Sequence, residues 1–492
     1  MSAVDLYGFQ ADAIEQLRTG IRAGKRRQIL SAPTGSGKTE CAIHLLAECH
    51  AKGKRGVFLC DRISLVDQTS ARLDKYEIPH GVIQANHWRW QPYQLIQVAS
   101  AQTLARRTWP NPDLVVIDEA HTVYGSVTAK ILGSEWVAVG LSATPFTKGL
   151  GRIYEGVVSV TTTNALIEQG YLAPFDIFAA SEPDMTGAKV TAGEWHEDEA
   201  AARSMPIVGD CVREYLKHGH NRKFIAFGCT VAHCEELERQ FLAAGVPTSL
   251  YTYRNGEEER SAALTEFRKP DSYIRGLISV SALAKGFDVE DIGVVIIARP
   301  LRSSLTEHIQ MLGRGLRKDS NNPMKRCIVL DHAGNSVRFW GPMAEFFEDG
   351  VSTLDDGSKK PKKKATPGEA EGRKCPTCHH VHAYRPTCPK CGHEYPTKRH
   401  VHEAGELAHL GNGNAATKVD KQRFYGELLT FAAARAYKPG WVANQYKARF
   451  GVWPRGLVEE PKAVSAETYR WVQSRQIRYA KSKAKADRHA RV

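Results

Sequence analysis

The chain has 492 residues, of which 42% are hydrophobic, and its formal net charge is +13. This length suits about three domains, and because no apolar run approaches the ~20 residues of a membrane span, we expect a soluble protein. The N-terminal residues lack a basic segment followed by an apolar core, so no secretory signal is predicted and a cytoplasmic location is expected.

The positive charge is concentrated towards the C-terminal end. Residues 351–492 contain 28 Lys and Arg against 13 Asp and Glu, a net +15, whereas the residues before them are close to neutral. A basic region on a neutral body indicates a polyanionic partner, most simply nucleic acid, with a solubilising tail as the alternative.

The first predicted element is a helix near residues 6–17, where apolar residues recur at helical spacing. Gln10 lies at its start. A glutamine amide can present one donor and one acceptor to an adenine edge, the alternative being an ordinary surface glutamine.

A glycine-rich loop follows an apolar run that ends at Leu30. Its sequence, Ser-Ala-Pro-Thr-Gly-Ser-Gly-Lys-Thr over residues 31–39, predicts a phosphate-binding loop, although Ala32 replaces the first glycine of the strict pattern. Backbone N–H groups and the following helix would converge on a triphosphate. Lys38 would neutralise the β and γ phosphates, and the Thr39 hydroxyl would help to hold Mg²⁺. The predicted nucleotide-binding residues are Pro33, Thr34, Gly35, Ser36, Gly37, Lys38 and Thr39.

An acidic pair supplies a second signal. Strands predicted at 56–60, 95–99, 114–118 and 137–141 alternate with helices, which indicates a parallel sheet that binds ligands at the carboxyl ends of its strands. Asp118 and Glu119 end one such strand, where an acid is costly without a cation or hydrogen-bond partner. Asp118 would bind Mg²⁺ and Glu119 would orient and deprotonate the attacking water, with a helix cap as the alternative.

A second alternation of strands, at 223–227, 276–280, 294–297 and 327–330, has no phosphate loop. It carries Arg314 and Arg317, which are predicted to share one helix face. Guanidinium groups suit phosphate oxygens and stabilise charge that develops at a γ-phosphate. A loop on one lobe and arginines on the other predict one ATP site at their interface, with lobe closure coupled to movement along a strand.

Two cysteine pairs follow a linker rich in Lys, Pro and Gly. Cys375-x2-Cys378 and Cys388-x2-Cys391 have zinc-ligand spacing, which in a reducing compartment favours a closed, structural Zn²⁺ site over disulfides. A redox role for the pairs is the alternative.

Residues 423–492 are predicted to be helical and basic, with interleaved aromatics. Stacking of bases on these rings would hold a single strand, although at helical spacing most of the rings are expected to form the module's own core. The stretch 480–491 is the best candidate for plain electrostatic binding.

These motifs resemble the superfamily 2 helicases of the DEAH-box type, in family order from Gln10 to Arg317. RadD-type bacterial repair helicases and related phage helicases are similar in overall look, because residues 330–335 and the zinc element also fit them. The resemblance implies an α/β fold with two tandem RecA-like lobes. It assigns Gln10 to adenine recognition, Gln310 to the catalytic arginine motif, Gly286 and Asp288 to the nucleotide, His121, Ser142 and Thr144 to coupling, and Arg62, Gln102, Thr103 and Thr230 to nucleic acid.

The expected organisation is a first lobe over 1–161, a second over 162–340, a basic linker over 341–373, a zinc ribbon over 374–397 and a basic helical tail over 398–492. The expected function is an ATP-dependent DNA helicase or translocase in repair, recombination or phage replication, with ATP, Mg²⁺ and Zn²⁺ as cofactors. Its expected partners are single-stranded or forked DNA and repair or replication proteins, without a membrane. Two alternatives stay open: an RNA helicase, and a nucleic-acid-binding scaffold that uses ATP as a conformational switch.

Overall fold

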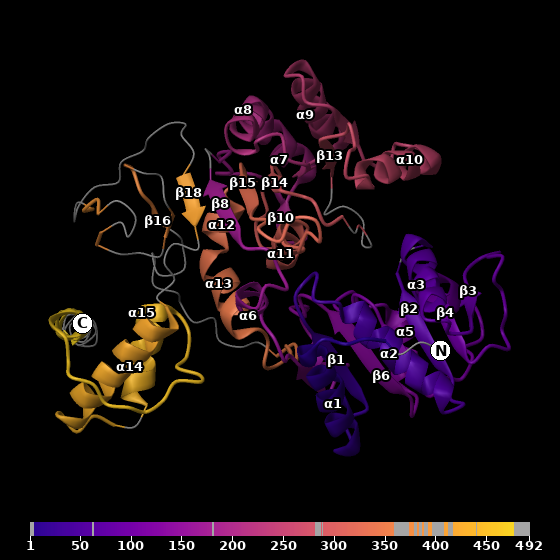
Figure 1. Ribbon diagram of the computed structural model, residues 1–492, viewed down its shortest axis with the longest axis horizontal. Helices are drawn as coiled ribbons and strands as arrows, with labels where there is room; N and C mark the ends of the chain where they lie inside the picture. Colours follow the sequence, from indigo (N-terminus) through magenta and orange to yellow (C-terminus); the bar gives the residue numbers. More distant parts are fainter. Residues whose placement is uncertain are drawn as a thin grey trace, which may run out of the picture. The chain divides into compact units, whose positions relative to one another are not determined.

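The computed structural model describes residues 4–61, 63–179, 182–280, 287, 289–358, 373–377, 381–382, 386–387, 392–395, 408–411, 417–438 and 440–476. It comprises two compact units, Met1–Asn412 and Gly413–Val492 (Figure 1). Within the described ranges, no helix is both long enough and apolar enough to cross a membrane.

The first lobe, drawn in indigo to purple in Figure 1, is built on a parallel sheet. Its strand order is β3-β4-β2-β5-β6-β1-β7. The strands are β1 (Arg27–Ser31), β2 (Gly56–Cys60), β3 (His80–Ile83), β4 (Ile96–Ser100), β5 (Leu114–Ile117), β6 (Val137–Ser142) and β7 (Gly156–Val158). The helices are α1 (Gly8–Arg22), α2 (Lys38–Ala51), α3 (Ile63–Lys75), α4 (Ala101–Leu104) and α5 (Gly125–Leu132), followed by a 3-10 turn at Leu150–Arg152.

Both faces of this sheet are buried, which explains why its strands are almost continuously apolar. Alternate residues of a strand point to opposite faces. In β2, Phe58 belongs to the cluster that includes Leu46 of α2, whereas its neighbour Leu59 belongs to the cluster that includes Ile131 of α5. The predicted strands of this lobe are therefore confirmed as members of one parallel sheet.

The second lobe repeats this plan, with the strand order β12-β13-β11-β14-β15-β8-β18. The strands are β8 (Phe175–Ala179), β11 (Phe224–Phe227), β12 (Thr248–Leu250), β13 (Gly276–Ser279), β14 (Val294–Ile297), β15 (Cys327–Asp331) and β18 (Ala408–Gly411), with a small hairpin of β9 (Val190–Thr191) and β10 (Glu194–Trp195). The helices are α6 (Thr163–Glu168), α7 (Glu197–Ser204), α8 (Val208–His218), α9 (Val231–Ala243), α10 (Glu257–Arg268), α11 (Leu305–Gly313), α12 (Asn335–Arg338) and α13 (Trp340–Asp349), with a 3-10 turn at Met205–Ile207. The predicted α/β class with two parallel-sheet lobes is thus confirmed.

One strand of the second sheet lies in a region that the sequence assigned to a helical tail. β18 pairs antiparallel with β8, so that Ala408 lies opposite Ala179 and Gly411 opposite Asp176. Without it, β8 would leave a row of backbone N–H and C=O groups unpaired at the sheet edge. Residues 408–411 therefore belong to the first unit, and the prediction of a helical tail beginning at residue 398 differs from the structure here.

The second unit is helical, as predicted. It contains α14 (Lys418–Ala433), α15 (Trp441–Phe450) and a helical stretch over 466–476. Its core consists of Phe424, Tyr425, Leu428, Phe431, Tyr446, Val452 and Val472, with Trp441 and Trp471 packed against it. Most of its aromatic rings therefore form the unit's own core, as expected from their helical spacing, and are not exposed stacking platforms.

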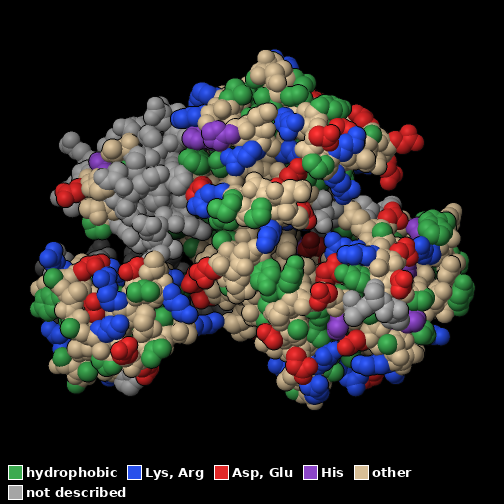
Figure 2. Space-filling view, in the orientation of Figure 1, with side chains coloured by type: hydrophobic (Ala, Val, Ile, Leu, Met, Phe, Trp, Pro, Cys, Tyr) green, Lys and Arg blue, Asp and Glu red, His purple; other side chains and the backbone are tan. Residues whose placement is uncertain are grey.

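Basic and acidic side chains are intermixed over the face of each unit drawn in Figure 2. Charge by itself therefore marks no nucleic-acid path on that face. Residues 480–491, the stretch expected to bind by electrostatics alone, lie outside the described residues.

Candidate active site

The glycine-rich loop connects β1 to α2 in the first lobe. Gly35 and Gly37 have φ angles of +85° and +79°, a backbone conformation that glycine adopts without strain. A Cβ at Gly37 would lie 2.4 Å from Nε2 of Gln10, so any other residue there would displace the Gln10 amide from the loop. The hydroxyl of Ser36 is buried without a hydrogen-bond partner among the described residues. A phosphate oxygen would satisfy this hydroxyl, so the loop fits the predicted ligand.

Lys38 begins α2 and folds back onto the loop. Its Nζ donates hydrogen bonds to the carbonyl oxygens of Ala32, at 2.8 Å, and Pro33, at 2.9 Å. Burial lowers the pKa of Lys38 to about 8, and the carboxylates of Glu119 and Asp118 oppose this shift. The lysine and the acidic pair therefore lie within the same electrostatic environment, as their common sheet edge predicts.

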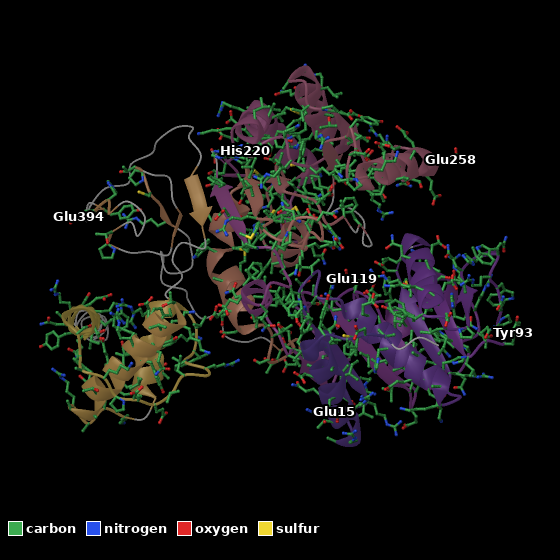
Figure 3. All side chains as sticks on the ribbon, in the orientation of Figure 1. Glu15, Tyr93, Glu119, His220, Glu258 and Glu394 are labelled. Carbon is green, nitrogen blue, oxygen red and sulfur yellow. The ribbon has the colours of Figure 1, made fainter. Side chains whose placement is uncertain are left out.

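The acidic pair lies at the carboxyl end of β5, where Glu119 is labelled in Figure 3. Asp118 Oδ1 accepts a hydrogen bond of 3.0 Å from the backbone N–H of Glu119. Glu119 has a φ of +47°, which is uncommon for a residue with a Cβ and is a form of strain found at functional sites. The surrounding structure therefore holds Glu119 in a backbone conformation that this residue does not favour by itself.

His121 links the acidic pair to the segment after β6. Its Nδ1 lies 3.2 Å from Glu119 Oε2 and 3.1 Å from Ser142 Oγ. Ser142 Oγ also accepts a hydrogen bond from the backbone N–H of Thr144, at 3.1 Å. The three predicted coupling residues, His121, Ser142 and Thr144, are thereby joined in one chain of contacts.

Gln10 contacts the phosphate loop in the structure. Its Nε2 donates to the carbonyl oxygens of Ser36, at 2.9 Å, and Gly37, at 3.4 Å, while its Oε1 accepts from the backbone N–H of Tyr7. The side chain is 2% exposed. Recognition of an adenine edge would require these bonds to be exchanged, so Gln10 here connects α1 to the loop.

The arginine segment of the second lobe differs from its prediction. The helix α11 ends at Gly313, Arg314 is its C-cap, and Arg317 forms a β-bridge with Leu172. The two arginines therefore do not share a helix face. They converge in another way, because Nη1 of each donates to the carbonyl oxygen of Phe287, at 3.2 Å from Arg314 and 2.9 Å from Arg317.

The arginine segment lies against the phosphate loop. A Cβ at Gly313 would lie 2.8 Å from Thr34 Cβ, and a Cβ at Gly35 would lie 3.4 Å from Arg317 Cγ. Nε2 of Gln310 also lies 3.4 Å from Nε2 of His121. The structure thus brings the arginine segment of the second lobe next to the phosphate loop and the acidic pair of the first lobe.

The remaining predicted site residues lie on α4 and at the start of α9, or are not described. Thr230 caps α9, where its hydroxyl accepts from the N–H of His233, and Gln102 is exposed on α4 next to Thr103. Arg62, Gly286 and Asp288 lie outside the described residues. So do Cys378, Cys388 and Cys391, whereas Cys375 is described and buried.

No group of three or more His, Cys, Asp or Glu among the described residues is arranged to hold a metal ion. The predicted zinc site stays a prediction, because three of its four ligands fall outside those residues. The Mg²⁺ prediction rests on oxygen donors, the Thr39 hydroxyl and the Asp118 carboxylate, which are the ligand type that this ion prefers.

Sequence reasoning missed an aromatic cluster beside Gln10. The ring centroid of Tyr171 lies 4.7 Å from that of Tyr7 and 5.2 Å from that of Phe9. Tyr171 directly precedes Leu172, the bridge partner of Arg317. The cluster therefore adjoins both the phosphate loop and the arginine segment, and only the paired aromatics at residues 7 and 9 hinted at it.

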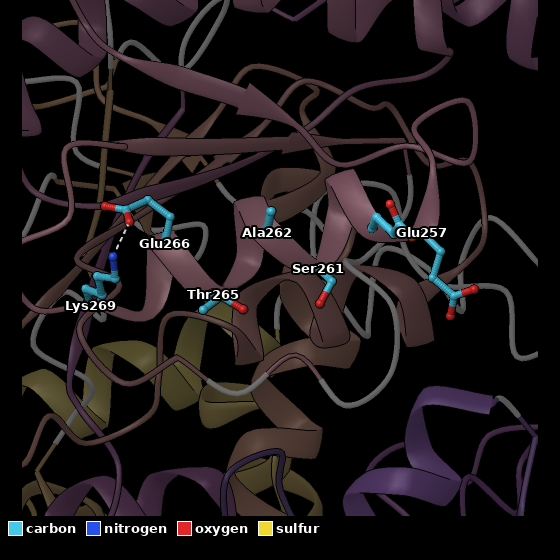
Figure 4. A pocket seen from close by; sticks show the side chains of 7 residues that line it. Glu257, Ser261, Ala262, Thr265, Glu266 and Lys269 are labelled. Carbon is cyan, nitrogen blue, oxygen red and sulfur yellow. Dashed lines mark hydrogen bonds and ion pairs between the residues drawn. The ribbon is translucent and has the colours of Figure 1, made fainter.

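A hollow of about 670 Å³ lies elsewhere, along α10 of the second lobe (Figure 4). The residues that line it are Glu257, Glu258, Ser261, Ala262, Thr265, Glu266 and Lys269. All of them belong to one helix or its end, and most of its charge is negative. This acidic surface does not suit a triphosphate.

Two RecA-like lobes, with the phosphate loop on one and the arginines on the other, define the class of two-lobe nucleoside-triphosphate motors. Comparison with known proteins agrees. The profile of the family "Type III restriction enzyme, res subunit" matches residues 3–147, and that of the helicase conserved C-terminal domain matches residues 208–319. These matches support a superfamily 2 ATP-dependent helicase or translocase that acts on nucleic acid, which agrees with the prediction at that level.

Individual relatives are distant. The 51.5 kDa protein of Lactococcus phage (isolate 7-9) is 25% identical over 434 residues, which cover 86% of this chain and 89% of that protein. The DNA 3'-5' translocase XPB2 of Sulfurisphaera tokodaii is 23% identical over 378 residues, covering 66% of this chain and 82% of that protein. A solved fragment of an HsdR subunit, assigned to a type I restriction enzyme from Vibrio vulnificus, superposes on this chain with a TM-score of 0.54. The sequences are 19% identical, and the match covers 71% of this chain and 69% of that chain, which shows the fold.

Proposed function

We propose that the protein hydrolyses ATP between its two lobes to move along DNA. The observation that carries this proposal is the contact between the phosphate loop and the arginine segment, at Thr34 and Gly313 and at Gly35 and Arg317. Neither lobe has both sets of groups, so hydrolysis needs the two lobes together. A change in their contact then accompanies each turnover, which is what a motor requires.

Each residue of the centre has a distinct role in this proposal. Lys38 leaves the Ala32 and Pro33 carbonyls to contact the β and γ phosphates. Thr39 and Asp118 hold Mg²⁺, which supplies charge neutralisation at the phosphates. Glu119 orients the attacking water and accepts its proton.

The arginines complete the centre from the second lobe. Arg314 and Arg317 exchange the Phe287 carbonyl for phosphate oxygens and stabilise the charge that develops there. Gln310 couples the position of the second lobe to the acidic pair through His121. Its amide can donate to Nε2 of His121, and Nδ1 of the same ring faces Glu119 and Ser142. A movement of the second lobe would thus shift His121 and, through it, the general base Glu119.

DNA is the proposed polymer, and the motor is proposed to be of the DEAH-box type and similar to RadD-type repair and phage helicases. The literal Asp-Glu-Ala-His sequence at residues 118–121 supports the type, and a relative whose name specifies DNA translocation supports the polymer. Single-stranded or forked DNA, in repair, recombination or phage replication, is the proposed setting.

A structural zinc site is proposed for the four cysteines. β16 (Arg373–Lys374) and β17 (Val381–His382) pair antiparallel around the first cysteine pair, and Thr387 bridges Glu394 around the second. Thr377 Oγ1 and His393 Nδ1, one near each pair, lie 2.9 Å apart. Two hairpins that meet in this way support a shared tetrahedral site of the zinc-ribbon kind.

The test is the steady-state ATPase rate of the full-length protein and of Lys38→Ala, each with no polymer, single-stranded DNA, duplex DNA, forked DNA or single-stranded RNA. Lys52→Ala serves as the control, because Lys52 is a surface lysine of the turn after α2. We expect stimulation by DNA in the wild type and Lys52→Ala, and none in Lys38→Ala. Stimulation by RNA alone would establish the RNA helicase instead, and tight binding without stimulated turnover would establish the scaffold.

A further inference from the structure

The connection between β3 and β4 exposes three large aromatic side chains in the first lobe. In this 84–95 loop, Trp88 is 79% exposed, Trp90 47% and Tyr93 76%. Tyr93 stands at the outer rim of the lobe, beyond β3 (Figure 3). A single exposed apolar residue is ordinary, but three large rings within six residues form a patch of the kind that marks a binding surface.

Contacts with α3 hold the loop in place. Arg89 donates to Ser70 Oγ at 3.1 Å and pairs with Asp74 at 2.7 Å, and Nε2 of His87 lies 3.2 Å from Asp67 Oδ1. The carbonyl oxygen of Arg89 also accepts from the backbone N–H of Val82 in β3. The rings are therefore displayed on a fixed loop, which reduces the entropy that binding would cost.

The other side of the loop contacts α4 and the turn that follows it. The Thr103 hydroxyl lies 3.5 Å from the N–H of Ala85, and Nη2 of Arg107 donates to the Ala85 carbonyl at 2.8 Å. α3 directly follows Arg62, and Thr103 is itself a predicted nucleic-acid contact. The loop is thus held between α3, which follows one predicted nucleic-acid contact, and α4, which carries two others.

Guanidinium groups accompany the rings. Arg89 lies over Trp88, at 4.7 Å from the ring centroid, and Arg107 lies over Trp90, at 4.9 Å. Asp74 neutralises Arg89, but Arg106 and Arg107 are exposed. Rings combined with cations suit a chain of phosphates and flat bases better than an apolar protein surface.

We propose that the 84–95 loop is a stacking platform for the bases of single-stranded nucleic acid, with Trp88, Trp90 and Tyr93 as the stacking rings and Arg107 as a phosphate contact. This inference rests on the proposed function, because it requires that a strand pass the first lobe. It adds a base-contacting element to the first lobe, beside the nucleic-acid contacts predicted at Gln102 and Thr103. Since stacking needs unpaired bases, the platform selects single strands over duplex.

The test is equilibrium binding of full-length Trp88→Ala, Tyr93→Ala and Arg107→Ala to a fluorescently labelled single-stranded oligonucleotide over a series of salt concentrations. Each ring removed should weaken binding at least about fivefold without changing the salt dependence, because stacking releases no counterions. Arg107→Ala should instead reduce the slope of log K against log salt by about 0.7. The control is Tyr273→Ala, a residue 68% exposed just before β13 in the second lobe, for which we expect no change.

The outcomes separate this inference from the proposed function. If the wild type binds single strands and its ATPase is stimulated, but both ring variants bind within twofold of Tyr273→Ala, the stacking platform is overturned and the motor stands. If the wild type neither binds nor is stimulated, the proposed function fails and the inference fails with it. Unchanged melting temperatures of the variants show that the lobe remains folded, and equal losses for duplex and single strands would also overturn the platform.

Discussion

Replacing Gly313 by alanine inserts a methyl group between the two lobes. An ideal Cβ there would lie 2.8 Å from Thr34 Cβ and 3.0 Å from Thr34 Oγ1. Carbon atoms in contact normally lie ~3.5–4.0 Å apart. Rotation of the Thr34 side chain does not move its Cβ, so the arginine segment must retreat from the phosphate loop by about 1 Å. A displacement of about 1 Å in a catalytic centre lowers kcat about 100-fold. We therefore expect Gly313→Ala to lose most of its DNA-stimulated ATPase, and Gly313→Val to lose more because its larger side chain separates the two segments further.

The assay is steady-state ATP hydrolysis at saturating single-stranded DNA, with the melting temperature recorded alongside. Gly315→Ala is the matched control, because its Cβ would lie 2.3 Å from Cys327 Sγ and 2.9 Å from Val295 Cγ2, inside the core of the second lobe. Gly315→Ala should lower the melting temperature through overpacking, at a cost of about 1–3 kcal/mol. The Gly313 variants should melt like the wild type. Wild-type kcat in both Gly313 variants would refute hydrolysis through this interlobe contact.

Burial lowers the pKa of free Lys38 to about 8, and a bound phosphate favours its charged form, so nucleotide binding takes up a proton above pH 8. The affinity of the wild type for a fluorescent ADP should fall by up to about tenfold per pH unit above that pH. The affinity of Lys38→Arg should not depend on pH in this range. A flat wild-type profile would contradict the assignment of Lys38 as the phosphate-binding lysine. Lys223→Met should lower the free energy of unfolding by about 3 kcal/mol, because this ammonium is 3% exposed, pairs with Asp291 and donates to two carbonyl oxygens. The control Lys269→Met removes an exposed ammonium and should cost less than about 1 kcal/mol. Equal urea midpoints for the two variants would refute this difference. Cys375→Ser should reduce the zinc content measured by atomic emission while ATP binding persists, and normal zinc content would exclude Cys375 as a ligand.

The sequence determined the features that depend on local chemistry. The phosphate loop could be predicted because a glycine-rich turn between a strand and a helix has one common ligand class. The position of Asp118 followed because a carboxylate at the end of an apolar strand needs a compensating partner. The parallel sheets followed from strands that are apolar on both faces, since only helices on both sides can bury them. The aromatic core around Phe424 followed from helical spacing.

Tertiary contacts decided the rest. α11 ends at Gly313, although Arg314 and Arg317 have the spacing of helical neighbours, because two glycines disfavour the helix and the following backbone pairs with Leu172. β18 exists because β8 offers an open edge, which no short segment reveals by itself. The rings of the 84–95 loop are the clearest case. They lie in solvent on a loop that is held by contacts with α3, β3 and Arg107, which are distant from it in the sequence. Sequence patterns report what a residue prefers locally, whereas exposure and interlobe contact depend on segments far away in the chain.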